Sequence, residues 1–149
     1  MKFRFRYHQL LNYRKALEDV AYADYAEAAQ ATRRAEEKLV ILNESVTRAH
    51  QEIAEVKKRG GSPSEKLVRL DQFISGQKIR IQNLKYEIRQ LKMREEELQD
   101  ILRHRAIERK TLDKLREKQR VEWREELKKR EGRVLDEIAT MNHPRRRHL

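Results

Sequence analysis

The sequence predicts an all-α fold: a long two-helix antiparallel coiled-coil hairpin with a C-terminal helical overhang. Three observations predict it. Apolar residues recur with a period of 3.5 over residues 67–112, and a glycine-rich break at residues 60–64 separates two long stretches with few helix breakers. The 149-residue chain is also 41% charged and only 38% hydrophobic. This apolar content is too small for a globular core of that length, but it is enough for the narrow seam between two helices.

Residues 67–112 carry the most regular part of the pattern. The a positions are Leu67, Ile74, Ile81, Ile88, Glu95, Leu102 and Arg109, and the d positions are Leu70, Gln77, Leu84, Leu91, Leu98, Arg105 and Leu112. Because most of these residues are apolar, the stripe must be buried against another helix with a left-handed supercoil. The polar members either set the register of the two helices or remain solvated.

The first helix is predicted over about residues 5–59, after an extended lead-in or fraying helix start. Phe3, Phe5 and Tyr7 alternate with cations in this lead-in, and packing of the rings on the neighbouring helix end is favoured over a docking peptide. The second half of the helix has a regular seam of Leu39, Leu42, Val46, Ala49, Ile53 and Val56. The first half is rich in alanine and buries less area, so it is expected to be less stable.

Residues 60–64 are predicted to form the turn of the hairpin. Gly60 suits the left-handed conformation that ends a helix, and it follows three cations at residues 57–59. Ser62 fits as the N-cap of the next helix, Pro63 as its first residue and Glu65 as its third, which forms a capping box. The first helix is therefore the internal partner of the heptad stripe.

The second helix is predicted over about residues 65–141, with a possible kink near residues 75–76, followed by a disordered basic tail at 142–149. The whole chain, residues 1–149, is then a single coiled-coil domain. A turn centred near residue 62 pairs residues whose numbers add up to about 124, so residues 120–141 overhang without an internal partner. The overhang carries an apolar stripe that is expected to contact another protein: Trp123, Leu127, Val134, Leu135 and Ile138.

The sequence contains no recognisable catalytic, phosphate-binding or metal-binding motif. The Gly60–Pro63 segment lacks the spacing of a phosphate-binding loop, and the absence of cysteine with five dispersed histidines leaves no metal-ligand pattern. The carboxylates lie on a solvated rod without a concavity. We therefore expect no enzyme, no catalytic residue, no cofactor and no metal, and no apolar run is long enough to span a membrane.

The net charge of +11 predicts affinity for an acidic partner. The basic clusters are interleaved with acidic residues, unlike the nearly acid-free face of a helix that grips DNA. Solvated coiled-coil flanks are therefore favoured over a phosphate-binding surface, and no nucleic acid is expected as a partner.

Three segments resemble the FliJ family of the flagellar type III export apparatus. Residues 3–14, FRFRYHQLLNYR, are similar to that family's Phe-x-Phe-Arg-Leu-Gln-x-Leu-Leu-x-x-Arg opening, with Tyr7 and His8 in place of Leu-Gln. Residues 108–118, ERKTLDKLREK, resemble its Glu-x-Lys-x-Leu-Glu-Lys-Leu-x-Glu block, and residues 135–139, LDEIA, its closing Asp-Glu-x-Ala. The likeness covers essentially the whole chain.

The resemblance implies a cytoplasmic rod, monomeric on its own and peripherally associated with the inner face of the cell membrane. Its implied partners are a hexameric export ATPase, which the rod enters and promotes, a transmembrane export gate protein, and export chaperones that it escorts. The implied ATPase-binding residues are Phe5, Leu10, Arg14, Arg109, Lys110, Lys114, Arg116 and Trp123. The implied gate-binding residues are Gln72, Phe73 and Ile74, although Gly76 and Gln77 follow where the family has apolar residues.

Three alternatives remain open from the sequence. The equivalent stalk protein of a virulence type III secretion system has the same fold and mode of action, and the identity of the neighbouring genes would distinguish the two systems. A basic coiled coil that binds nucleic acid would show a salt-dependent shift of DNA. A structural homodimeric tether would show the mass of two chains in solution.

Overall fold

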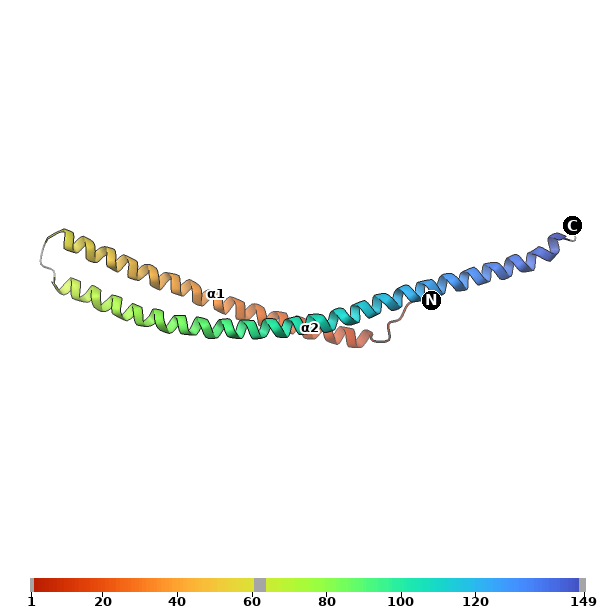
Figure 1. Ribbon diagram of the computed structural model, residues 1–149, viewed down its shortest axis with the longest axis horizontal. Coiled ribbons are helices and arrows are strands. Elements are labelled where there is room, and N and C mark those ends of the chain that lie inside the picture. The colour runs from red at the N-terminus through yellow and green to blue at the C-terminus, as the bar shows by residue number, and fades with distance from the viewer. Residues whose placement is uncertain (1, 61–63, 148–149) are drawn as a thin grey trace. The chain divides into compact units, whose positions relative to one another are not determined.

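The computed structural model describes residues 2–60 and 64–147, which form two long helices (Figure 1). Helix α1 spans His8–Lys58 and helix α2 spans Ser64–Arg147, and no strand occurs in these residues. The two helices pack against each other as an antiparallel hairpin, so the predicted fold class is confirmed. Contacts group the chain into two units, Asp19–Arg103 and Met1–Glu18 with His104–Leu149, called the hairpin unit and the terminal unit below.

The predicted heptad stripe is the seam of the hairpin. All fourteen a and d positions between residues 67 and 112 are buried or half-buried, and so are the six predicted seam residues in the second half of α1. In the hairpin unit, Ala35 of α1 packs with Leu84 and Ile88 of α2, and half-buried leucines surround this cluster. The seam is therefore closed by residues of the same chain.

A buried glutamine fixes the register within the hairpin unit. Gln77 is only 7% exposed, and its Nε2 donates a hydrogen bond of 2.9 Å to Oγ of Ser45. The Ser45 hydroxyl donates in turn to the carbonyl of Leu42 at 2.6 Å, and Arg80 donates to Oε1 of Gln77 at 3.2 Å. Sliding one helix along the other would leave the buried Nε2 of Gln77 without its Ser45 acceptor, which is costly. Gln77 is thus a register-setting polar residue in the seam.

The observed register matches the predicted one. Five polar pairs join the helices, and the residue numbers in each pair add up to between 118 and 128. The pairs are Arg14–Glu108, Glu18–Arg109, Glu36–Lys92, Ser45–Gln77 and Glu52–Lys66.

The end of α1 follows the predicted capping pattern. Gly60 takes the left-handed conformation, with φ of 68°, and Lys57 and Lys58 occupy the last turn of the helix. Cations there stabilise the partial negative charge of a helix C-terminus. The predicted caps at Ser62 and Pro63 lie outside the described residues, while Glu65 stands in the first turn of α2.

One predicted boundary of α2 differs from the structure. The helix continues without a break through Ser75 and Gly76, and the kink expected near them stays a prediction. It also continues to Arg147, whereas residues 142–149 were expected to form a disordered tail. A helix satisfies its backbone hydrogen bonds internally, and residues 142–147 contain no glycine. Pro144 opposes the helix, because it lacks a backbone donor and its ring crowds the carbonyl four residues earlier.

The seam makes a direct prediction about stability. Ile88 is 7% exposed and packs in the central cluster, so Ile88→Ala is expected to lower the free energy of unfolding by about 2–4 kcal/mol. Ile107→Ala removes the same atoms from a side chain that is 61% exposed and should change it by less than about 0.5 kcal/mol. Urea denaturation followed by circular dichroism measures both. Equal losses from the two substitutions would contradict the assignment of the seam.

Candidate functional site

The N-terminal lead-in folds as a short segment of its own in the terminal unit. Helix α1 begins at His8, three residues later than predicted, after a turn at residues 6–7. The amide of His8 donates to the carbonyl of Phe5 at 3.2 Å, and both Phe5 and Leu11 are buried. The chain thus leaves the helical path before His8, and the Phe5 ring is buried in this bent arrangement.

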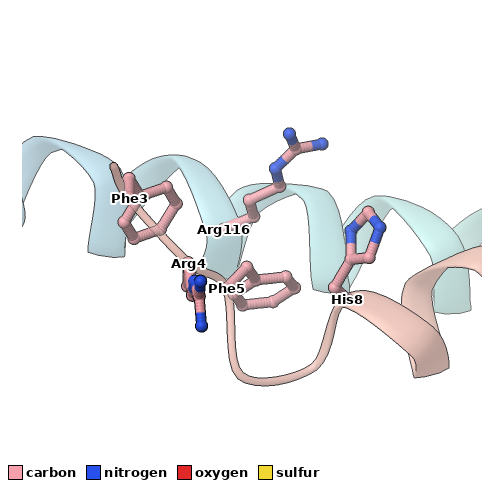
Figure 2. A pocket seen from close by; sticks show the side chains of 5 residues that line it. All are labelled: Phe3, Arg4, Phe5, His8 and Arg116. Atoms are coloured by element: carbon pink, nitrogen blue, oxygen red, sulfur yellow. The ribbon is translucent and has the colours of Figure 1, made fainter. Parts of the chain in front are cut away.

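Alternation of aromatic and basic residues divides the lead-in into two faces. Phe3 and Phe5 lie between the lead-in and α2, while Arg4 points to the other side (Figure 2). The centroid of the Phe3 ring is 6.0 Å from that of Trp123 on α2. Phe3 and Phe5 therefore pack toward the neighbouring helix, as the favoured interpretation of the sequence expects, whereas Tyr7 is exposed and contacts the Phe5 ring. Phe3, Arg4, Phe5, His8 and Arg116 line a hollow of about 360 Å³ beside this contact.

The contact with Phe3 moves the start of the unpartnered part of α2. Trp123 is half-buried, so the overhang begins after residue 123 and not at residue 120 as the turn geometry predicted. Beyond it, Val134, Leu135, Ile138 and Met141 are all exposed. In Figure 1 no other part of the terminal unit runs beside this last stretch of α2. The expectation that this apolar stripe contacts another protein stays a prediction.

Two arginines tie α1 to α2 in the terminal unit. Arg14 pairs with Glu108, and Arg109 pairs with Glu18 through two nitrogens, the second at 3.2 Å from Oε1. Arg109 also donates to Asp113 at 2.8 Å. Hydrogen bonds to Glu18 and then to Asp113 raise the pKa of Arg109 above its usual value, so the guanidinium stays charged. These pairs position the first three turns of α1 on α2.

The arginine pairs have a consequence for the cations around them. Glu108, Asp113 and Glu117, the acidic residues of α2 between positions 108 and 118, are all paired with arginines. Four cations are exposed and have no ion pair among the described residues: Lys110, Lys114, Arg116 and Lys118. The positive charge of this segment is thus directed to solvent, where a negatively charged partner can reach it.

Three of these cations lie on one face of α2. Lys110, Lys114 and Lys118 follow at four-residue intervals, which places them along one side of a helix. Ile107 and Val121, which are 61% and 43% exposed, bound the row at its two ends. We call these five residues the basic stripe. It combines positive charge with apolar contact area at both ends.

The structure brings all eight predicted ATPase-binding residues into the terminal unit, in different roles. Phe5 is buried under the lead-in, Trp123 is half-buried beneath Phe3, and Leu10 is 39% exposed. Arg14 and Arg109 are engaged within the chain by Glu108 and by Glu18 with Asp113. Lys110, Lys114 and Arg116 remain exposed and available to a partner.

The predicted gate-binding residues also separate by burial. Gln72 and Phe73 are exposed on the hairpin unit, whereas Ile74 is 5% exposed and belongs to the seam. Ile74 occupies an a position, and its side chain cannot serve the core and a partner at once. Only Gln72 and Phe73 are therefore available for contact.

Comparison with known protein families covers nearly the whole chain. The family model described as the flagellar FliJ protein matches residues 2–148. The chain belongs to the FliJ family. FliJ proteins are components of the flagellar export apparatus, which favours the flagellar over the virulence alternative. No curated protein and no solved structure matches the chain.

Sequence reasoning missed several residues that stand out in the terminal unit. Lys118, Ile107 and Val121 belong to the basic stripe, and the spacing 3, 4, 4, 3 from residue 107 to residue 121 could have identified them. Glu18 was missed because the Arg109 partner depends on the helix register, which sequence alone gives only approximately.

Neither a metal site nor a membrane span emerges from the described part of this FliJ-family chain. In residues 2–60 and 64–147, no three or more His, Cys, Asp or Glu side chains lie together in a way that could hold a metal ion. The helices there include no stretch that is both long and apolar enough to cross a membrane.

Trp123 reports directly on the lead-in because it is the only tryptophan of the chain. Phe3→Ala removes the ring that covers it, so tryptophan emission should shift to the red and acrylamide should quench it more strongly. Phe73→Ala removes an equal ring from the hairpin unit and is expected to change neither. Identical spectra for Phe3→Ala and the unmodified chain would show that the lead-in does not pack on α2.

The Glu18–Arg109 pair is expected to couple the helices more strongly than exposed pairs do. The two side chains are 23% and 26% exposed and share two hydrogen bonds, so a double-mutant cycle with alanine should give about 1 kcal/mol. The Glu36–Lys92 pair also joins α1 to α2, but its side chains are 46% and 61% exposed. Its coupling should stay below about 0.5 kcal/mol. Coupling at Glu18–Arg109 no larger than at this control pair would contradict the prediction.

Proposed function

We propose that the chain is a non-enzymatic component of the flagellar export apparatus that inserts its terminal unit into a hexameric export ATPase and promotes its activity. Membership of the FliJ family supports the assignment to the export apparatus. The observation that carries the proposal is the basic stripe with Arg116, whose cations are exposed while the neighbouring carboxylates are paired with arginines.

The proposed mechanism is that the rod contacts the subunits of the ATPase ring unequally. Lys110, Lys114, Lys118 and Arg116 pair with acidic loops in the pore of the ring, and opposite charge accelerates their encounter. A rod that contacts ring subunits unequally stabilises some subunit conformations over others and so shifts their populations. Arg14 and Arg109 act indirectly here, because they hold α1 against α2 and pair with Glu108 and Asp113.

The contact with the transmembrane export gate is proposed for Gln72 and Phe73. Both side chains are exposed on the hairpin unit, and the Phe73 ring is 45% exposed. A partly exposed aromatic ring offers a large contact area at low entropic cost. Ile74 supports this contact from within the seam.

The proposal also includes the escort of export chaperones and a cytoplasmic location at the inner face of the cell membrane. Both rest on family membership. A chain that meets a ring-shaped ATPase and a membrane gate must work on the side of the membrane where both are accessible.

Charge reversal on the exposed cations tests the ATPase contact. In a Lys110→Glu, Lys114→Glu, Arg116→Glu variant, repulsion replaces attraction at the acidic loops. The concentration that gives half-maximal stimulation of the ATPase should rise at least about tenfold, corresponding to about 0.5 kcal/mol per contact. The hairpin should remain folded, because none of the three takes part in an ion pair described for the chain.

A matched control has the same change in charge on the hairpin unit. Lys38→Glu, Lys78→Glu, Lys85→Glu alters three exposed lysines and should leave stimulation unchanged. Unaltered stimulation by the folded terminal-unit variant, or equal loss in both variants, would reject the proposed contact.

A further inference from the structure

The hairpin unit has a second seam that faces away from α1. Seven positions of α2 follow the alternating four- and three-residue spacing of a coiled coil and are all exposed: Gln72, Gly76, Ile79, Asn83, Tyr86, Gln90 and Met93. We call them the outer seam. None of them is charged, although 41% of the chain is.

The outer seam has the composition of a helix-binding surface. Ile79, Tyr86 and Met93 occupy one heptad position and are 63%, 59% and 57% exposed. Glycine, asparagine and glutamine occupy the other, so large apolar side chains alternate with small or amide side chains. A stripe of this period buries its apolar members only against another helix.

The residues beside the outer seam discriminate between possible partners. Arg80 and Glu87 flank it on the side toward α1, where they line a hollow of about 380 Å³ together with Ile41. Neither takes part in an ion pair among the described residues; Arg80 only donates to Gln77. A positive and a negative group seven residues apart on the same flank are complementary to an identical helix that runs in the opposite direction.

The geometry of antiparallel coiled coils places these charges together. In such a pair, e positions of one helix face e positions of the other, and Arg80, Glu87, Phe73 and Arg94 are the e positions of the outer seam. When Asn83 lies opposite Tyr86 of a second copy, Arg80 of each copy faces Glu87 of the other. Phe73 then faces Arg94 of the second copy, which suits a cation–π contact.

The parallel arrangement of two copies is electrostatically worse. In a parallel pair, g positions face e positions of the following heptad, which places Arg89 beside Arg94 of the second copy at two sites. Like charges across such an interface are unfavourable. The antiparallel arrangement has no such conflict, and it sets Gly76 opposite Met93, a small residue against a large one.

We propose that the outer seam binds a second copy of this chain, forming an antiparallel homodimer through α2 of the hairpin unit. The dimer buries Gln72 and Phe73, so it covers the surface proposed for the export gate and competes with that contact. Twenty-two residues of one helix pair form an interface at the small end of the range for specific complexes. The monomer expected from the sequence is therefore the dilute form.

Sedimentation of the full chain measures the association. The weight-average mass should rise from 18.1 kDa toward twice that value as the concentration increases from about 10 μM to 1 mM. Arg80→Glu sets like charges opposite each other and should weaken association at least tenfold. Adding Glu87→Arg exchanges the two charges and should restore the association. If Arg80→Glu weakened association only by removing the Arg80–Gln77 hydrogen bond, the second substitution would not restore it.

Lys78→Glu is the matched control, because it reverses a charge on the same helix at an exposed position away from the outer seam. It should leave the association unchanged. A mass that stays at 18.1 kDa throughout, or a double variant that associates no better than Arg80→Glu, would overturn the proposal. If the outer seam instead binds a helix of another protein, the mass stays at 18.1 kDa throughout.

The direction of the two chains has its own test, since the chain contains no cysteine. A spin label on Asp71→Cys, at an exposed position near one end of the outer seam, reports the distance between the two copies. The antiparallel pair separates the labels by about 40 Å along the axis, at 1.5 Å per residue. A parallel pair brings them within about 20 Å, because paired helix axes lie about 10 Å apart, and that result would also contradict the proposal.

Discussion

The structure depends on one constraint, which is that an apolar stripe of period 3.5 on α2 must be covered along its length. Leu84 and Ile88 would be exposed on an isolated helix, and α1 covers them with Ala35, Leu39 and Leu42. Because the covering helix belongs to the same chain, the hairpin forms without a partner. The outward faces of both helices then remain available for binding.

Polar residues within and beside the seam have distinct tasks. Gln77 satisfies its amide through Ser45 and Arg80 and fixes the register, whereas Arg109 satisfies Glu18 and Asp113 and joins the helices near the termini. Arginine suits these inward pairs because its planar guanidinium binds carboxylates through two hydrogen bonds. Lys110, Lys114 and Lys118 of the basic stripe are exposed and form no ion pair among the described residues. In the terminal unit, Arg14 and Arg109 thus carry structural charge, whereas these lysines and Arg116 face solvent.

Most of the fold was predictable because it rests on local and periodic signals. The a and d positions, the left-handed Gly60 and the approximate register all follow from spacing and turn chemistry. The site was less predictable. Whether Arg109 is free or paired depends on which residue of α1 lies opposite, and a shift of one turn changes the answer. The cover of Trp123 by Phe3 also required a non-helical path, for which alternation of aromatic residues gave only a partial signal.

The most direct measurement is site-specific photo-cross-linking to the assembled export ATPase. A photoreactive residue replaces Lys114 in the basic stripe or, in a separate variant, Lys78 on the hairpin unit. Both positions are exposed, so reactivity alone does not distinguish them. If the terminal unit enters the ring, position 114 cross-links to the ATPase and position 78 does not. Cross-linking from position 78 alone, or from neither position in a complex that forms, would contradict the proposed contact.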